Sequence, residues 1–172
     1  MNKYVKRYLI DALGGMAQGL FASLLIGTIV KTLGQQLLRL GSNPIFTFLV
    51  DAGAFASDAH VVGAAMAVGI GFAMQVPALV LFTLAATGSA ANVSGGAGGP
   101  LAVLFIAILS AEAGCLVSKK TKVDIIVTPL VTLLTGALLT VLTAKYIGKA
   151  ASAFGNIIVW ATTLRPFLMG MI

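Results

Sequence analysis

Long apolar stretches, interrupted by very few charged residues, restrict the fold of this chain more than any other feature. The first runs from about Leu9 to Leu33, and its only charged residues are Asp11 and Lys31. A helix needs about 20 apolar residues to cross the hydrocarbon core of a bilayer, so this stretch is long enough to cross. Charged residues make up only 9% of the chain, too few to cover the surface of a soluble domain. We therefore predict an all-α membrane protein.

The other apolar stretches bring the expected number of transmembrane helices to about five, in a single transmembrane domain over residues 1–172. Val61–Ala90 has Pro77 near its middle. One kinked helix and two short helices both fit this stretch, because proline kinks a helix and also marks helix ends. Further crossings are expected at Pro100–Val117 and Val123–Ala144.

Two segments combine polar and apolar residues in a way that predicts interfacial amphipathic helices. In Gly34–Ala59 the apolar part, Ile45–Val50, is too short to span a bilayer, so this segment is interfacial or partly inserted. Lys145–Leu164 carries Trp160, a residue typical of membrane interfaces. It also has a polar stripe, which predicts a helix lying along the membrane surface: Lys145, Lys149, Ser152 and Asn156.

Small residues recur at every fourth position of the first apolar stretch: Gly15, Gly19, Ser23 and Gly27. Small residues in register let a second helix approach closely within a membrane. We therefore expect helix packing along this face, and such faces also favour a homo-oligomer.

An internal repeat is suggested by two stretches that align at an offset of 114 residues, LFASLLIGTIVKTLG from Leu20 and LTGALLTVLTAKYIG from Leu134. Both end in Lys-x-x-Gly and lead into an amphipathic segment. Repeats of this kind are common in transporters, although chance similarity between apolar sequences explains the match equally well.

The net charge of +6 points to the lipid bilayer as the partner and not to nucleic acid, because the basic residues mostly flank apolar stretches. Cytoplasmic loops are rich in Lys and Arg. The basic N-terminus (Lys3, Lys6 and Arg7) and the turn Ser118–Lys122 are therefore expected on the cytoplasmic side, which places the basic residues of Lys145–Leu164 on the other side.

The segment Thr87–Pro100, TGSAANVSGGAGGP, is the least helical part of the sequence, because glycine loses much backbone entropy in a helix. We predict a loop, with Pro100 opening the next helix. Non-helical backbone at membrane depth lines a cavity or is buried in protein. The loop is thus the best candidate for a solute site, and a plain water-exposed connector is the alternative. Its candidate binding residues are Asn92, Ser94, Gly95, Gly96, Gly98 and Gly99.

Glu112 and Gln75 complete the set of candidate substrate-binding residues, because both lie inside apolar stretches. Charges within membranes usually face a cavity or a partner, so a structural ion pair with a basic residue is the alternative for Glu112. His60 is the only histidine, which excludes a histidine-based metal cluster within one chain. We expect no metal, no cofactor and no catalytic residue.

Several stretches resemble the membrane subunits named phosphotransferase-system EIIC, of the small type-2-like family: GGPLAVLFIAILSAEAGCLVSKKTKVDIIV from Gly98 with the following TPLVTLL, the later GNIIVWATTLRPFLMGMI, and the opening KRYLIDALGGMAQGLFASLLIGTI. The resemblance implies a multi-pass protein of the bacterial plasma membrane that translocates a sugar while cytoplasmic phosphotransferase subunits phosphorylate it. It covers about the first half of a usual member. We therefore expect a truncated form, as the apolar run after Arg165 and Pro166 also suggests.

Two other functions fit the sequence. One is a channel or ion-coupled carrier for a small solute, since the chain shows no phosphorylatable domain. The other is a membrane sensor or scaffold without transport.

Overall fold

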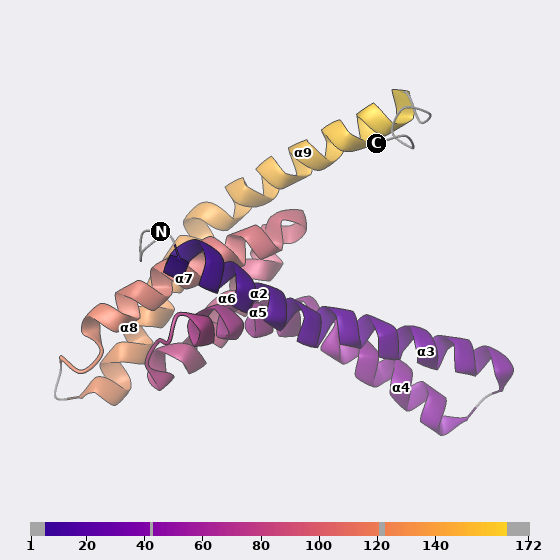
Figure 1. The fold of residues 1–172 in the computed structure, drawn as a ribbon, viewed down its shortest axis with the longest axis horizontal. Coiled ribbons are helices and arrows are strands. Elements are labelled where there is room, and N and C mark those ends of the chain that lie inside the picture. Colours follow the sequence, from indigo (N-terminus) through magenta and orange to yellow (C-terminus); the bar gives the residue numbers. More distant parts are fainter. Residues whose placement is uncertain (1–5, 42, 121–122, 165–172) are drawn as a thin grey trace.

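The computed structural model describes residues 6–41, 43–120 and 123–164, and every regular element in these ranges is a helix. The prediction of an all-α membrane protein is confirmed. Lys3 of the basic N-terminus, Lys122 of the basic turn and the apolar run after Arg165 lie outside the described residues. The main helices are α2 (Ala12–Leu20), α3 (Ile26–Leu40), α4 (Pro44–Ala56), α5 (Ala59–Ala73), α6 (Ala78–Gly95), α7 (Gly99–Val117), α8 (Asp124–Leu139) and α9 (Lys145–Leu164) (Figure 1).

The first long helix is continuous over Lys6–Leu40, because a π-helical turn at Lys6–Asp11 leads directly into α2 and a second one at Phe21–Leu25 joins α2 to α3. At about 1.5 Å per residue it is about 50 Å long, well beyond the ~30 Å of a bilayer core. The predicted crossing Leu9–Leu33 lies inside it. The prediction that a separate segment begins at Gly34 is wrong, because α3 continues through Gly34 and ends only at Leu40.

Helix α4 turns back along α3, and the pair forms an arm that projects from the bundle (Figure 1). Asn43 starts α4 by accepting a hydrogen bond from the Ile45 N–H at 3.1 Å. A Cβ on Gly34 would lie 2.8 Å from the backbone nitrogen of Val50, so the two helix backbones are close. Helix α5 follows α4 with a bend of 54°. The predicted interfacial segment is therefore mostly a regular helix, and its depth in a bilayer stays a prediction.

The apolar stretch around Pro77 forms two helices and not one kinked helix, the two possibilities that the sequence leaves open. Helix α5 ends at Ala73, and α6 begins just after Pro77. Between them the backbone of Gln75 has a positive φ of 54°. A positive φ cannot continue a right-handed helix, and the proline ring then suits the start of the next helix.

Helices α6 and α7 form a hairpin joined by a short turn, Gly95–Gly99, which we call the glycine turn. The prediction of a loop over Thr87–Pro100 is wrong for most of its length, because α6 stays helical to Gly95. Close packing against α5 outweighs the cost of glycine in a helix: Gly88 lies against Gly63 and the Cβ of Ala67. Gly96 needs glycine, since its φ is +52°. Pro100 lies in the first turn of α7, as predicted.

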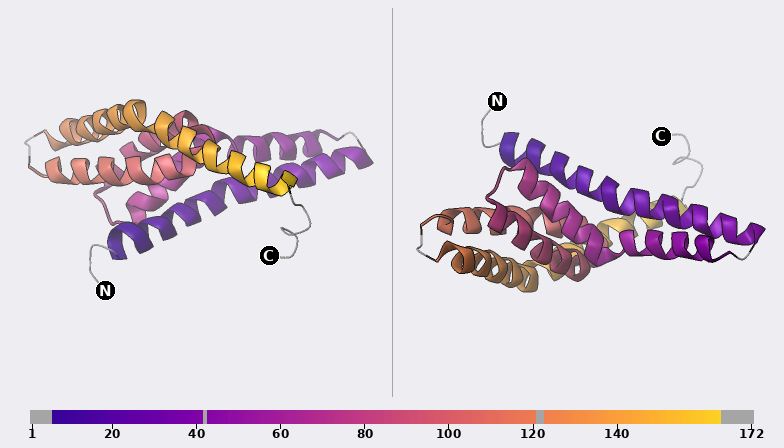
Figure 2. Two further views of the ribbon diagram at one scale, coloured as in Figure 1. Left: turned by 90° about the horizontal axis from the view of Figure 1, so that it is seen from above. Right: turned by 90° about the horizontal axis from the view of Figure 1, so that it is seen from below.

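Helices α8 and α9 also form one continuous helix, joined by a π-helical turn at Thr140–Ala144. The prediction of a separate surface helix from Lys145 is therefore wrong about its start. Helix α7 lies beside α8 (Figure 2). Helix α9 leaves the bundle as a second projection (Figure 1). Whether α9 lies along a membrane surface stays a prediction, and the side chain of Trp160 lies outside the described residues.

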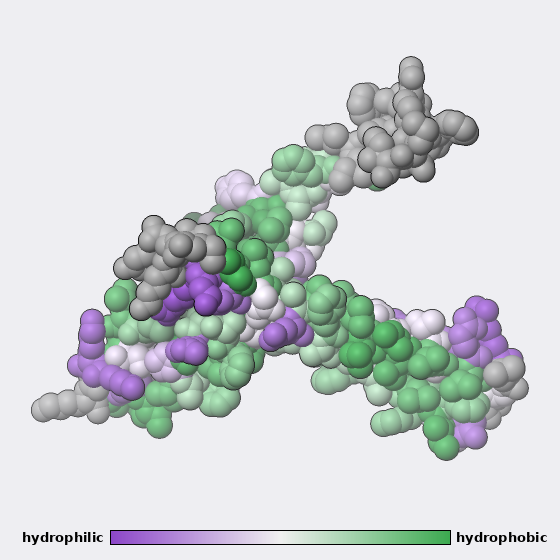
Figure 3. Space-filling model, in the orientation of Figure 1, coloured by the Kyte–Doolittle hydropathy of each residue, from purple (hydrophilic) through white to green (hydrophobic). Residues whose placement is uncertain are grey.

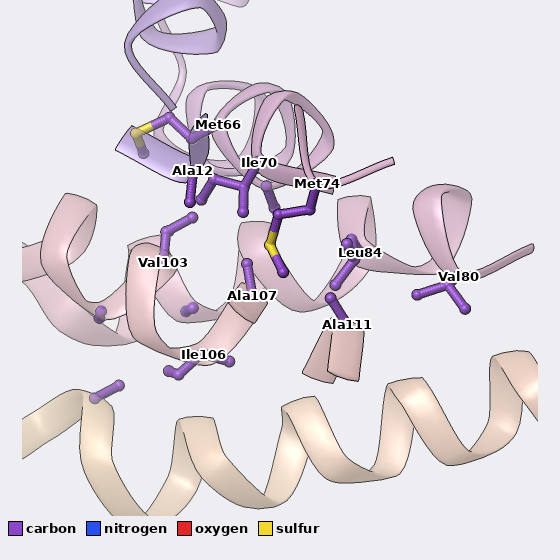
Figure 4. Packing of buried hydrophobic residues seen from close by; sticks show 14 of the residues in the cluster. Ala12, Met66, Ile70, Met74, Val80, Leu84, Val103, Ile106, Ala107 and Ala111 are labelled. Carbon is purple, nitrogen blue, oxygen red and sulfur yellow. The ribbon is translucent and has the colours of Figure 1, made fainter. Parts of the chain in front are cut away.

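The apolar core lies between α2, α5, α6 and α7 (Figure 4). Its members include Met66 and Ile70 of α5 and Met74 directly after the end of that helix, and all three are buried. The predicted packing along the small-residue face is present, because Gly15 touches the backbone of Gly69 and Gly19 touches that of Ala65. The backbones of α2 and α5 are therefore in direct contact.

Much of the surface is apolar (Figure 3), as expected for a protein surrounded by lipid. In the part of the chain that the structure describes, three helical stretches are long and apolar enough to cross a membrane: Lys6–Arg39, Ala78–Val117 and Asp124–Asn156. The bent pair α4–α5 would make a fourth. The sequence predicts about five. The two counts differ because Ala78–Val117 doubles back at the glycine turn and so passes through the bundle twice.

Candidate functional site

The predicted site residues lie at opposite ends of α6, and the structure does not bring them all together. Helix α6 has 18 residues and is therefore about 27 Å long. The glycine turn, with Asn92 and Ser94, lies at its carboxyl end. Gln75 lies just before its amino end, and Glu112 is near the carboxyl end of the antiparallel α7. One solute of ordinary size cannot contact both groups at once.

A hollow of about 470 Å³ lies between the glycine turn and α9, and we call it the glycine-turn hollow. Three of the predicted residues line it: Ser94, Gly95 and Gly96. The opposite wall is the predicted polar stripe of α9 with its small neighbours, and the lining there consists of Lys145, Gly148, Lys149, Ser152, Ala153 and Asn156. Both walls thus offer polar groups to a solute.

Glycines hold α9 against the turn. Gly148 leaves no room for a side chain, because a Cβ there would meet the carbonyl oxygen of Gly95. A Cβ on Gly98 would lie 2.9 Å from the carbonyl oxygen of Ile147. Gly98 is buried in this contact and therefore supports the hollow without being among its lining residues.

Asn92 and Gly99 likewise make contacts with other residues of the protein and do not line the hollow. The Asn92 side-chain amide donates a hydrogen bond of 2.7 Å to the Ala59 carbonyl oxygen, which ties α6 to the start of α5. Gly99 packs directly against the side chain of Asn92. Asn92 therefore positions the hairpin in this conformation, and neither residue is among those lining the hollow.

Gln75 is exposed and lines a second hollow of about 450 Å³, which we call the Gln75 hollow, together with Lys6, Arg7, Asp11 and Met74. This hollow joins the break between α5 and α6 to the start of the first long helix. It contains both signs of charge, so its walls partly neutralise each other.

Glu112 forms an ion pair with Arg7, in which Oε1 lies 3.3 Å from Nη2. The structure therefore shows the structural ion pair that the sequence leaves as the alternative. The two side chains are 34% and 42% exposed, so solvent weakens the attraction to about 1 kcal/mol or less. The pair links α7 to the first long helix beside the Gln75 hollow.

Lys145 and Lys149 are the main residues of the glycine-turn hollow that sequence reasoning did not include in the site. Their signal was visible, since both belong to the polar stripe that predicts an amphipathic helix. The sequence does not show that this stripe faces the glycine turn, because the contact joins residues about fifty positions apart.

Comparison with known proteins identifies the family. A family model described as "Phosphotransferase system, EIIC" matches residues 10–172. No curated protein and no solved structure matches the chain. The family match extends over nearly all of the chain and confirms the resemblance seen in the sequence. With its apolar helices and this match, the chain is a multi-pass membrane protein that belongs to the EIIC family of the phosphotransferase system.

Proposed function

We propose that this chain carries a sugar across the bacterial plasma membrane and that the solute binds in the glycine-turn hollow. Membership of the EIIC family supports a role as a transporter component of a phosphotransferase system. The observation that carries the proposal is the hollow itself, which places the predicted glycine turn opposite the polar stripe of α9.

The size and lining of the hollow suit a small polar solute. Its volume of about 470 Å³ falls in the ordinary range for small-molecule sites. Ser94 and Asn156 offer a hydroxyl and an amide, and such groups both donate hydrogen bonds to sugar hydroxyls and accept them. Under this proposal phosphoryl transfer belongs to cytoplasmic partner subunits. Gln75 and Glu112 do not touch a solute bound in the hollow.

The test is uptake of labelled sugars by bacterial cells that produce the chain. The panel includes neutral sugars, sugar acids and sugar phosphates. The Asn156→Leu variant should lower uptake about fivefold, because a lost hydrogen bond to a solute costs roughly 1 kcal/mol. The matched control is Gln36→Leu, which makes a similar change on the exposed face of α3. Quantifying each variant in the membrane fraction corrects for differences in production.

Dependence on phosphoenolpyruvate separates this function from its rivals. A phosphotransferase permease should lose uptake in cells that lack the shared phosphocarrier proteins. Uptake that persists in those cells, together with ion currents in reconstituted bilayers, would instead show a channel or ion-coupled carrier. Equal loss of uptake in Asn156→Leu and Gln36→Leu would remove the hollow from the proposal.

A further inference from the structure

We infer that the glycine-turn hollow binds an anionic group of the solute, a carboxylate or a phosphate, and so selects a sugar acid or a phosphorylated sugar over a neutral sugar. This inference rests on the proposed function and narrows its substrate class. It is carried by the two lysines that line the hollow and by the absence of an acidic side chain from the described lining residues.

Two lysines on one face of α9 supply the positive charge. Lys145 and Lys149 are four residues apart on α9, both are exposed, and both line the hollow. Like charges at this spacing repel each other in a helix. An anion bound between them would relieve that repulsion.

No acidic side chain among the described residues pairs with these lysines. All five acidic residues of the chain lie in the described ranges, and none lines the hollow. Each has a different place in the fold: Asp11 in the Gln75 hollow, Asp51 on α4, Asp58 at the start of α5, Glu112 beside Arg7 and Asp124 at the start of α8. The ion pair between Arg7 and Glu112 is the only one among the described residues.

Asp58 is the acidic residue at the same end of the bundle as the glycine turn, and its carboxylate is already engaged. Its Oδ1 accepts a hydrogen bond from the His60 backbone N–H at 2.8 Å, which caps α5. The Asn92 amide bonds to the neighbouring Ala59, so this part of α5 lies on the Asn92 side of α6. Asn92 does not line the hollow, which is consistent with a separate position for Asp58.

The backbone ends at the glycine turn do not decide the sign of the charge in the hollow. The carboxyl end of α6 and the amino end of α7 meet there. They carry partial charges of about half an elementary charge and of opposite sign, so they largely offset each other. The two full positive charges of the lysines therefore dominate the local field.

A solute with one anionic group and several hydroxyls matches this arrangement. The lysines form charge-assisted hydrogen bonds to the anion, which are stronger than neutral ones. Ser94 and Asn156 remain for the hydroxyls. The Ser152 hydroxyl already donates to the Gly148 carbonyl oxygen at 2.9 Å, so it is left mainly as an acceptor.

A phospholipid headgroup carries the same anionic chemistry, so the test compares solute and lipid. The full chain is purified in a neutral detergent, and calorimetry measures binding of gluconate, glucose 6-phosphate and glucose. We expect the two anions to bind about tenfold more tightly than glucose, a difference of about 1.4 kcal/mol, because charge-assisted hydrogen bonds are stronger than neutral ones. In the lipid arm, thermal stability is measured in nanodiscs of phosphatidylcholine with and without phosphatidylglycerol.

The variants assign the effect to the two lysines. Replacing both by glutamine (K145Q with K149Q) should remove the preference for anions, and replacing both by arginine should keep it. K119Q with K120Q removes the same charge at the basic turn that follows α7 and should change nothing. All four lysines are exposed, so loss of folding is not expected.

Three outcomes would overturn the inference. Equal binding of glucose and gluconate would leave the proposed function standing with a neutral substrate. A response of the lysine variants to phosphatidylglycerol alone, without gluconate binding, would make the hollow a lipid headgroup site. Absence of binding by all three solutes would also reject the inference, and the uptake assay then decides separately whether the transport function fails with it.

Discussion

At the residue scale, Gly14 and Gly15 are neighbours in sequence with opposite surroundings. A Cβ on Gly15 would meet the backbone of Gly69, whereas a Cβ on Gly14 would have nothing within 4 Å. We expect Gly15→Ala to lower the free energy of unfolding by about 1–3 kcal/mol, as overpacked sites do. Gly14→Ala is the matched control and should be neutral or stabilising by up to about 1 kcal/mol, since alanine favours the helix. Thermal unfolding in detergent measures both, and equal effects would contradict the backbone contact.

Gln75 provides a second prediction, because its backbone conformation and its predicted binding role can be separated. Its φ of 54° costs a non-glycine residue about 1 kcal/mol or more. Gln75→Gly should therefore keep or raise the unfolding temperature, while Gln75→Val should lower it. If uptake falls in Gln75→Gly although the protein is at least as stable, the side chain itself takes part in transport. We expect unchanged uptake, because Gln75 lies outside the glycine-turn hollow.

Individual residues show how far the sequence could predict contacts. The spacing of Gly15 and Gly19 predicts a packed face because the pattern is local and regular. The partner of Glu112 could only be named as some basic residue, because Arg7 is more than one hundred positions away. The hydrogen bond from the Asn92 side chain to the Ala59 carbonyl oxygen could not be predicted from the sequence either. Such pairs form only when several helices have packed.

At the element scale, α9 should depend on glycine for its contact with the turn. Gly148 lies against the backbone of Gly95, whereas a Cβ on Gly155 of the same helix would have nothing within 4 Å. Gly148→Leu should release α9 and abolish the glycine-turn hollow while the α6–α7 hairpin persists. We expect faster hydrogen exchange of α9 amides in Gly148→Leu than in the control Gly155→Leu. The same exchange rate in both variants would contradict the contact.

Element types were easier to predict than element boundaries. The crossing at Pro100–Val117 is found almost as predicted, since proline opens α7 and the polar turn follows it. The glycine-rich segment was misjudged because intrinsic propensity disfavours a helix there, while close packing of Gly88 against α5 favours one. The start of α9 was misjudged for a related reason. Lys145 is the first residue of the polar stripe, but a lysine does not end a helix, so the helix before it continues into α9.

At the scale of the whole molecule, the ends of the bundle should face opposite sides of the membrane. Arg7 bonds to Glu112 near the end of α7, so the start of the first long helix lies at the same end as Lys119. The glycine turn lies at the other end. In a background with Cys115→Ser, we expect Lys119→Cys to react with a membrane-impermeant maleimide from the cytoplasmic side and Ala97→Cys from the outer side. Labelling of both from one side would refute this topology.

Two whole-molecule predictions from the sequence stay predictions. The homo-oligomer was expected from small-residue faces, yet Gly15 and Gly19 pack within the chain, so they do not need a second copy. The internal repeat stays a prediction as well. Gly34 and Gly148, which the alignment equates, both allow close contacts, but the first meets α4 and the second meets the glycine turn.

The π-helical turn at Phe21–Leu25 gives the first long helix an unusual sensitivity to insertions and deletions. Each residue of an α-helix turns the chain by about 100°, and a π-turn accommodates one extra residue. Loss of a single residue here would leave α2 seated on α5 but would swing Gly27 and Gly34 away from α4. A surface loop tolerates the deletion of one residue, whereas the same deletion here would change the direction of the arm formed by α3 and α4. Among natural variants of the gene, we therefore expect insertions and deletions within Phe21–Leu25 to be far rarer than amino-acid substitutions.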